Sequence, residues 1–588
     1  MVGSSPQNRH LLPLVLALLS AGCSAVVNET PVDTVPPGTS PPGTSSVTSV
    51  TTTTTSSSRT ECIDPTGGMA AIDSGAIATD ALTLSSENFI CARDVVVVSE
   101  GNESEAVAAA QLAAAMDSPL LFPHPLLAAE LGRLKPERVH VVGSTVVDTP
   151  STAEVVSHDI ASAVQAVGVL LEAPVSGPVD ESSVVVDAII ALESENAAIL
   201  PDEGTVTTSS PDRLVAGLAR ETGDRPVWIV DATDPVNALL AAVAAKAANA
   251  AVVPVDGADL FRYPEVGLAI AGYPDRAMRQ VGFSSALDDW KLRTVARGQQ
   301  LPGGGFEVFP DHISRRFVGF YGNPASPALG AMGQVPPQQA LAMMRDGGSL
   351  TGYIATGCLP SPCQGTVQAG LLDGFAADGA HVVPTFNYIA SVAQPRCGTR
   401  LFPIEDFQAG IDVAGESGGY VVFDLQPGSQ DFLTHAQFYE SALRLPHVSV
   451  GIDPEWRCAW PGQTDFDRRG TVTAAEINLV IEWLADLVNS EALPQKLLVI
   501  QQFRDDMIQD RDQLASRPEV QVVIQMDGEA QGNLGNKDGT WNNITADTDD
   551  NHWRWGWKNF FVRDHPNGPY TPAETLNRTP VPVYITYQ

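Results

Sequence analysis

Basic residues are scarce in this sequence of 588 residues, which has 34 Lys and Arg against 69 Asp and Glu and a formal net charge of −35. A protein that wraps nucleic acid needs basic patches that displace counterions from phosphates. The composition therefore excludes nucleic acid as an expected partner. It also argues against broad adhesion to anionic polymers.

The sequence also lacks several motifs and, after its first 20 residues, any apolar run near the ~18 residues of a membrane-spanning helix. It has no Gly-x-Gly-x-x-Gly after a strand, no Walker-type phosphate loop, no Gly-x-Ser-x-Gly and no His-Glu-x-x-His. Its 10 histidines are scattered without ligand spacing. We therefore expect no nucleotide cofactor, no other cofactor and no metal.

The N-terminus has the features of an export signal. Arg9 and His10 precede the short apolar run Leu11–Leu19, as in a signal peptide. The following Ser20–Cys23 resembles a bacterial lipobox, which implies a signal peptide over residues 1–22 and a lipid on Cys23. The expected location is the outer face of the cytoplasmic membrane, held by the N-terminal lipid. An ordinary cleaved signal with a nearby cysteine is the alternative.

Residues 23–60 are rich in Ser, Thr and Pro, and they repeat Pro-Pro-Gly-Thr-Ser at Pro36–Ser40 and Pro41–Ser45. Such a composition buries too little apolar surface to offset chain entropy. We expect a disordered linker that acts as a spacer, with a glycosylated stalk as the alternative.

Six cysteines follow Cys23, and an even number in an exported protein favours disulfides. Six cysteines allow 15 pairings. A zinc site is the competing interpretation, but no further Cys or His lies at the spacing of a zinc finger from Cys358 and Cys363. Proximity in sequence suggests Cys62–Cys91, Cys358–Cys363 and Cys397–Cys458.

Residues 61–300 alternate apolar strands with alanine-rich helices, which indicates Rossmann-like parallel sheets covered on both faces. The order of strand, helix and strand occurs twice, as an internal repeat. Its first copy is expected at Asp94–Val98, Glu103–Ala115, Pro119–Phe122 and Val139–Gly143, and its second at Val227–Asp231, Asn237–Asn249, Ala251–Val255 and Gly267–Gly272.

This region resembles the bacterial cell-wall-binding repeat of the second type. The motifs that match in order are Gln111–Ala115, Ser118–Leu121 and Val141–Ser144, and Asp212–Leu214 stands where the family has an Asp-Arg-aromatic opening. The resemblance implies association with anionic wall polymers. A plain Rossmann-like structural domain is the alternative.

Residues 301–588 carry apolar strands at intervals suited to a (β/α)8 TIM-like barrel. An open parallel sheet is the alternative. The expected helices are Pro336–Met344, Gln430–Leu443, Ala474–Val488 with Thr473 as its cap, Asp505–Ala515 and Thr571–Leu576. The expected strands are Phe317–Gly322, Val382–Tyr388, Tyr420–Leu425, Val448–Ile452, Lys496–Gln502, Val520–Met526, Trp555–Phe561 and Val583–Tyr587.

Polar and aromatic residues gather where these strands end, and the active sites of such barrels lie at the carboxyl ends of the strands. Carboxylates beside aromatic rings are typical of a carbohydrate cleft. Alternatively, these charges only pair with one another, for example Lys558 or Arg504 with Asp424 or Asp527. The candidate catalytic residues are Asp424, Asp453, Glu455 and Asp527, and the candidate substrate-binding residues are Gln426, Trp456, Gln502, Arg504, Trp557, Lys558 and Tyr587.

The segment Asp453-Pro454-Glu455 is the most specific of these. Residues two apart on a strand point the same way, and neighbouring carboxylates raise one pKa into the range of a general acid. The pattern is similar to the Asp-x-Glu that ends the fourth strand in chitinase-like and lysozyme-like barrel glycosidases. That resemblance implies Glu455 as the acid and Asp453 as the group that orients an N-acetyl group or stabilises charge.

The second half as a whole resembles a family of exported actinobacterial proteins with glycosidase-like barrels. The resemblance implies the fold and no particular activity. It rests on Asp424–Gly428, Asp453–Arg457, Gln502–Arg504, Gly556–Phe560 and Tyr584–Gln588.

Together these features predict an exported surface lipoprotein whose barrel binds cell-wall or extracellular polysaccharide and hydrolyses it by carboxylate acid/base catalysis. The alternative is a lipoprotein that binds glycan, or serves as a scaffold, without catalysis.

Overall fold

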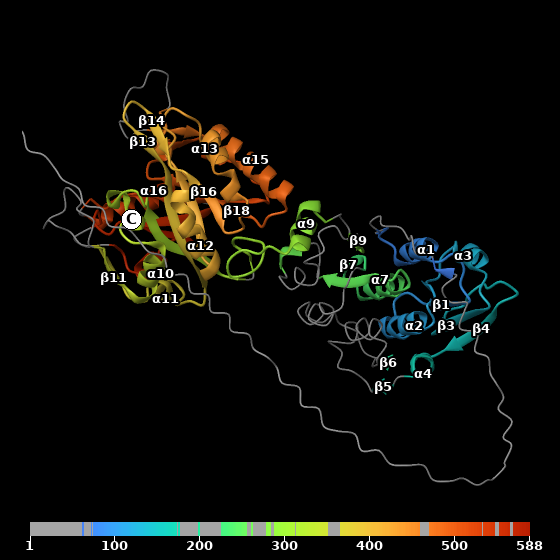
Figure 1. Ribbon diagram of the computed structural model, residues 1–588. Helices are drawn as coiled ribbons and strands as arrows, with labels where there is room; N and C mark the ends of the chain where they lie inside the picture. Colours follow the sequence, from blue (N-terminus) through green and yellow to red (C-terminus); the bar gives the residue numbers. More distant parts are fainter. Residues whose placement is uncertain are drawn as a thin grey trace, which may run out of the picture. The chain divides into compact units, whose positions relative to one another are not determined.

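The structure is a computed structural model (Figure 1). It describes residues 62–63, 72, 74–172, 174–176, 198–199, 225–255, 260–262, 278–283, 287–311, 313–350, 365–458, 470–531, 533–546, 552–564 and 569–588. The predicted signal peptide, Cys23, the linker, Asp212–Leu214, the strand Gly267–Gly272 and the Cys358–Cys363 pair lie outside these residues.

The first α/β repeat forms a parallel sheet in the order β2-β1-β3-β4. All five residues of β1 are buried, which explains why four valines follow Asp94 without a break. The predicted strands and alanine-rich helix are confirmed. The bounds are α1 Ile77–Asn88, β1 Asp94–Val98, α2 Glu103–Ala115, β2 Leu120–Leu121, α3 Leu127–Leu134, β3 Arg138–Val142, β4 Glu154–His158 and α4 Ile160–Leu171.

The second repeat forms a parallel sheet in the order β8-β7-β9. Asp234 caps α7, because its side chain accepts hydrogen bonds from the backbone N–H groups of Val236 and Asn237. α2 and α7 belong to one hydrophobic cluster, where their alanines pack closely. The bounds are β7 Val227–Asp231, α7 Pro235–Ala247, β8 Ala251–Val255, η2 Leu260–Arg262, β9 Met278–Val281 and α9 Asp289–Arg297, with short strands β5 Val175–Ser176 and β6 Ala198–Ile199 before them.

The C-terminal half is a closed barrel, and all eight predicted strands are confirmed within its described residues. Every neighbouring pair in the ring is parallel. β10 pairs with β22 on one side and with β13 on the other, so the ring closes and the open-sheet alternative is wrong. In ring order the strands are β10 Arg315–Gly322, β22 Tyr584–Tyr587, β21 Arg554–Asn559, β20 Val520–Met526, β18 Lys496–Gln502, β16 Val448–Ile452, β15 Tyr420–Leu425 and β13 His381–Gln394.

Side chains inside the barrel change from apolar to polar toward the carboxyl ends of the strands. Because strand side chains alternate, residues two apart share a face. On five strands a buried apolar residue of one cluster is followed, two positions later, by a buried polar one. The five pairs are Val383 and Thr385, Val422 and Asp424, Val499 and Gln501, Val523 and Gln525, and Tyr584 and Thr586. The barrel interior therefore has an apolar layer and, nearer the carboxyl ends of the strands, a polar layer.

Helices pack outside the ring, and most of the predicted ones are confirmed (Figure 1). Thr473 caps the longest of them by accepting from the N–H of Glu476. The helix predicted at Asp505–Ala515 is wrong: Asp510 has a left-handed φ of 55°, and two 3-10 turns flank a short strand. The bounds are η3 Pro327–Leu329, η4 Ala331–Gly333, α10 Pro337–Asp346, α11 Leu371–Phe375, η5 Ile404–Phe407, α12 Gln408–Ser417, α13 Phe432–Phe438, α14 Glu440–Leu443, η6 Pro454–Trp456, α15 Ala474–Glu491, η7 Asp505–Met507, η8 Arg511–Gln513, α16 Leu534–Ile544 and α17 Pro572–Leu576.

A disulfide ties a hairpin of the barrel to the loop after β16. β13 extends beyond the ring and pairs antiparallel with β14 (Gly398–Leu401), and Cys397 in their turn is bonded to Cys458. The predicted pair Cys62–Cys91 is also present. The remaining short strands are β11 Gly348–Leu350, β12 Gly365–Val367, β17 Val472–Thr473 and β19 Ile508–Gln509. Among the described residues, no helix has both the length and the apolar content needed to cross a membrane.

Candidate active site

A cavity of about 490 Å³ lies at the carboxyl ends of the barrel strands. One part of its wall is apolar and comes from β13 and η3. Another part carries carboxyl groups and a lysine, and the lining includes four aromatic side chains. The lining residues discussed below are Tyr321, Leu329, Ile389, Val392, Gln426, Asp453, Glu455, Trp456, Phe503, Asp527, Glu529, Lys558, Phe560 and Arg563.

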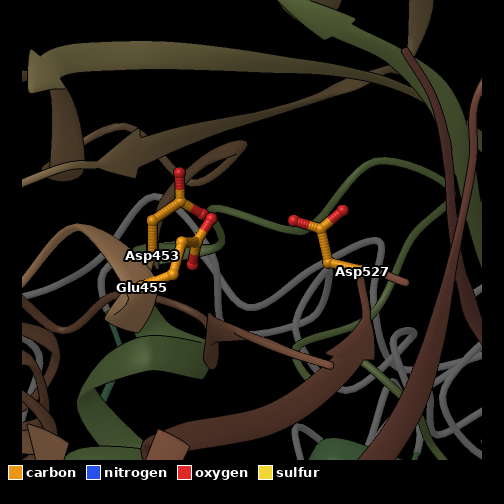
Figure 2. A group of neighbouring side chains, drawn as sticks. All are labelled: Asp453, Glu455 and Asp527. Carbon is orange, nitrogen blue, oxygen red and sulfur yellow. The ribbon is translucent and has the colours of Figure 1, made fainter. Parts of the chain in front are cut away.

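Asp453 and Glu455 lie in the turn after β16. The strand ends at Ile452, and Pro454 begins the 3-10 turn η6, so strand alternation does not bring these two carboxyls together. The turn does so instead. Each has a carboxyl oxygen within 4.8 Å of the other and of an oxygen of Asp527, which follows β20. Figure 2 shows Asp453 and Glu455 side by side, with Asp527 across from them.

Asp453 is 2% exposed and is held by neutral donors. Its Oδ2 accepts from Gln426 Nε2 at 3.0 Å and from Tyr321 Oη at 3.4 Å, whereas Oδ1 has no partner among the described residues. Burial raises the pKa of Asp453 well above its usual range, and the nearby carboxyl of Asp424 raises it further. The environment of Asp453 therefore favours its protonated form.

Glu455 is 9% exposed, and its Oε2 has no hydrogen-bond partner in the described part of the chain. Burial is the largest cause that raises the pKa of Glu455 well above its usual range, followed by the carboxyls of Asp453 and Asp527. Glu455 therefore combines two properties of a general acid, because it faces the cavity and its environment favours the protonated form.

Asp527 differs because a lysine lies beside it. Lys558 Nζ is 3.2 Å from both carboxyl oxygens of Asp527 and 3.6 Å from the ring centre of Tyr321. Burial raises the pKa of Asp527 to about 6, while Lys558 acts to lower it. Burial lowers the pKa of Lys558, but the surrounding carboxylates outweigh this effect and raise it. The pairing of Lys558 with Asp527 that the sequence suggested as an alternative is thus present.

Asp424 lies beneath the cavity in the polar layer and is fully buried. Its Oδ2 accepts from Tyr321 Oη at 2.7 Å and from Gln501 Nε2 at 3.0 Å. Burial raises its pKa to about 6. Gly451 on the next strand leaves room for this group, since a Cβ there would lie 2.9 Å from Asp424 Oδ1.

The structure brings seven of the predicted site residues together, six at the cavity and Asp424 directly beneath it. The six lining residues are Gln426, Asp453, Glu455, Trp456, Asp527 and Lys558.

Four predicted substrate-binding residues are not in the described lining of this cavity. Trp557 is buried against Trp541, and Tyr587 packs against Phe561. Gln502 accepts from Arg511 Nη1 at 2.9 Å. Arg504 pairs with Asp506 rather than with Asp424 or Asp527.

Tyr321 is the main site residue that sequence reasoning missed. It contacts Asp424, Asp453 and Lys558 from β10. Its place as the next-to-last residue of a predicted strand was the available signal, because side chains at the carboxyl ends of barrel strands reach the active site. The apolar wall at Leu329, Ile389 and Val392 was also not predicted.

By its fold and its cavity, the protein is an α/β protein with a closed parallel barrel and a buried cluster of carboxyl groups. No protein-family model matches the sequence, and no curated protein matches it. Two solved structures of cell-wall proteins show a distant likeness.

These are Cwp8 from Clostridium difficile, with 15% identity and a TM-score of 0.31, and Cwp6 from Clostridium difficile, with 11% identity and a TM-score of 0.30. The Cwp8 match covers 39% of this chain and 52% of Cwp8, and the Cwp6 match covers 61% and 63%. The chain thus spans less than two thirds of either protein. At these TM-scores the likeness carries no argument about function.

Proposed function

We propose that the barrel hydrolyses a cell-wall or extracellular glycan, with Glu455 as general acid and Asp527 as the charged partner. The observation that carries this proposal is the contrast between the two carboxyls. Glu455 faces the cavity with an oxygen that has no hydrogen-bond partner among the residues described, whereas Lys558 Nζ lies 3.2 Å from Asp527. Environments that drive two carboxyl pKa values apart support an assignment of acid and base roles.

The reaction would proceed in two displacements. Glu455 donates its proton to the leaving glycosidic oxygen while a carboxylate oxygen of Asp527 bonds to the anomeric carbon. The Glu455 carboxylate then takes a proton from water, whose oxygen attacks the same carbon and releases Asp527. Carboxyl groups about 5–5.5 Å apart are typical of this retaining route, and those of Glu455 and Asp527 have oxygens within 4.8 Å.

The cavity has features that suit a sugar ring. Trp456, Phe503 and Phe560 supply aromatic surface, and the acidic cluster lies on the same lining. Gln426 holds Asp453 next to Glu455, so Asp453 is the residue placed to orient a polar substituent of the sugar.

The remaining sequence predictions are part of this proposal. The chain would be an exported surface lipoprotein with a signal peptide over 1–22, a linker over 23–60, a cell-wall-binding-like region over 61–300 and the barrel over 301–588. The lipid on Cys23 would anchor it to the outer face of the membrane. The resemblance of the first repeat to cell-wall-binding repeats supports a wall polymer as partner.

A glycan-binding protein without catalysis is the second candidate. The ion pair between Lys558 and Asp527 favours it, because a carboxylate that is already paired is a weaker nucleophile. In this case the cavity would bind glycan without cleaving it. Neither the wild type nor Glu455→Gln would then release reducing ends.

A screen of wall and extracellular glycans with the full chain tests the proposal, with release of reducing ends as the measurement. We expect turnover by the wild type and at least a ~100-fold loss in Glu455→Gln. Asp512→Asn, an exposed acid in η8, is the matched control and should retain full activity. Equal turnover by Glu455→Gln would remove the proposed acid, and binding without turnover would support the second candidate.

A further inference from the structure

Acidic groups outnumber basic groups on the cavity wall. Four carboxyls, those of Asp453, Glu455, Asp527 and Glu529, share the lining with Lys558 and Arg563. Both cations already have acidic partners, since Lys558 pairs with Asp527 and Arg563 with Glu529. Among the described residues, Asp453 and Glu455 are therefore left without an ion-pair partner.

The three carboxyls at the centre of this wall enclose a space of the size of an ion. Asp453, Glu455 and Asp527 each contribute an oxygen, and all three oxygens lie within 4.8 Å of one another. An ion at the centre of such a triangle would be at most about 2.8 Å from each oxygen. Calcium binds oxygen at about 2.3–2.6 Å and magnesium at about 2.0–2.1 Å. Side-chain shifts of a few tenths of an ångström would therefore suit calcium, whereas magnesium needs a larger contraction.

Unpartnered oxygens provide a second observation that points to a ligand. Within the described part of the barrel, Asp453 Oδ1 and Glu455 Oε2 are buried atoms with no hydrogen-bond partner, on side chains that are 2% and 9% exposed. Gln426 holds the other oxygen of Asp453, which fixes the carboxyl plane as an outer-shell amide does for a metal ligand. The adjoining cavity of about 490 Å³ has room for the water ligands that complete a coordination sphere.

We propose that Asp453, Glu455 and Asp527 form a binding site for a hard divalent cation of the size of calcium. Cation binding displaces the protons of Asp453 and Glu455, and the three carboxylates with Lys558 nearby then have a charge of −2, which one such cation neutralises. The site goes beyond glycan hydrolysis and exists whether or not the barrel is an enzyme. If the barrel is a hydrolase, cation and substrate compete, because the cation occupies Glu455.

Terbium luminescence tests this site directly in the full chain. Terbium replaces calcium at oxygen sites, and Trp456 on the cavity wall is close enough to Glu455 to sensitise its emission. We expect saturable emission that calcium displaces with a Kd on the order of 10⁻⁴–10⁻³ M, the range of extracellular calcium modules. Glu455→Gln and Asp453→Asn should each weaken calcium binding by at least ~10-fold, because each removes a charged ligand.

Glu529→Gln is the matched control, since it removes one charge from the same wall but leaves the three carboxyls intact. It should weaken calcium binding less than ~3-fold if the three carboxyls are the site. An equal loss in Glu529→Gln would overturn the proposal, because diffuse acidity of the cavity would then explain the binding. If the wild type itself shows no saturable binding of terbium or calcium, the proposed cation site is wrong. Hydrolysis is assayed separately in a chelator, so failure of the cation site and failure of the proposed function are distinguishable.

Discussion

The buried carboxyls beneath and around the cavity should make the barrel less stable as the pH rises, and Asp424 offers the cleanest test. Burial raises the pKa of Asp424 from 3.8 to about 6. Because this folded-state pKa lies above that of the unfolded chain, stability is greatest below about pH 4 and falls as the pH rises through 6. One pKa unit corresponds to about 1.4 kcal/mol. Ionisation of Asp424 should thus cost about 3 kcal/mol by pH 8, roughly half of it between pH 5 and pH 8.

Asp424→Asn removes this ionisation and keeps the hydrogen bonds, since the amide oxygen can accept from Tyr321 and Gln501 as Asp424 Oδ2 does. The assay is unfolding in guanidinium at pH 5 and pH 8, followed by fluorescence of the buried tryptophans of the barrel. We expect the variant to lose about 1.5 kcal/mol less stability than the wild type over this range. Parallel pH dependence of the two proteins would refute the reasoning, and Asp512→Asn should follow the wild type.

Two further changes test the surroundings of the site. Lys558→Met removes the cation beside Asp527, so the pKa of Asp527 should rise further above 6 and the carboxyl should stay protonated at pH 7. We expect at least a ~100-fold loss of glycan turnover at pH 7 with partial recovery at pH 9, and unchanged turnover would contradict the role of Asp527. Replacement of Cys397 and Cys458 by serine releases the link between the β13–β14 hairpin and the loop after Glu455. Guanidinium unfolding should show a loss of about 2–4 kcal/mol, whereas an unchanged midpoint would mean that other contacts hold this loop.

Most of the barrel strands were predictable because each contains a short run of apolar residues. β15, β16 and β18 are buried at every position, so their sequences contain no exposed residues that would disguise them. The 3-10 turns at 505–513 were not predictable in this way. Their composition allows a helix, but the backbone is already extended at Ile508, which pairs with Val472, and it is left-handed at Asp510.

The candidate site was predicted in part, and in one respect for the wrong reason. Asp453 and Glu455 meet, but a turn that begins at Pro454 brings them together rather than the alternation of a strand. Tyr321 was missed because a tyrosine within an apolar strand has the same sequence pattern whether it packs in the core or contacts a carboxyl. Trp557 shows the converse, since an aromatic residue that was predicted to bind substrate packs in the core.

The central claim is that Glu455 donates a proton to the leaving group. The most direct test is how strongly the loss of turnover in Glu455→Gln depends on the acidity of the leaving group. Turnover of a glycan cleaved by the wild type is compared with that of an aryl glycoside of the same sugar whose phenol leaves without protonation. The claim predicts a loss of about 10²–10⁴-fold on the glycan and little loss on the activated glycoside. Equal losses on both substrates would contradict it, because Glu455 would then act on binding or structure and not on the proton.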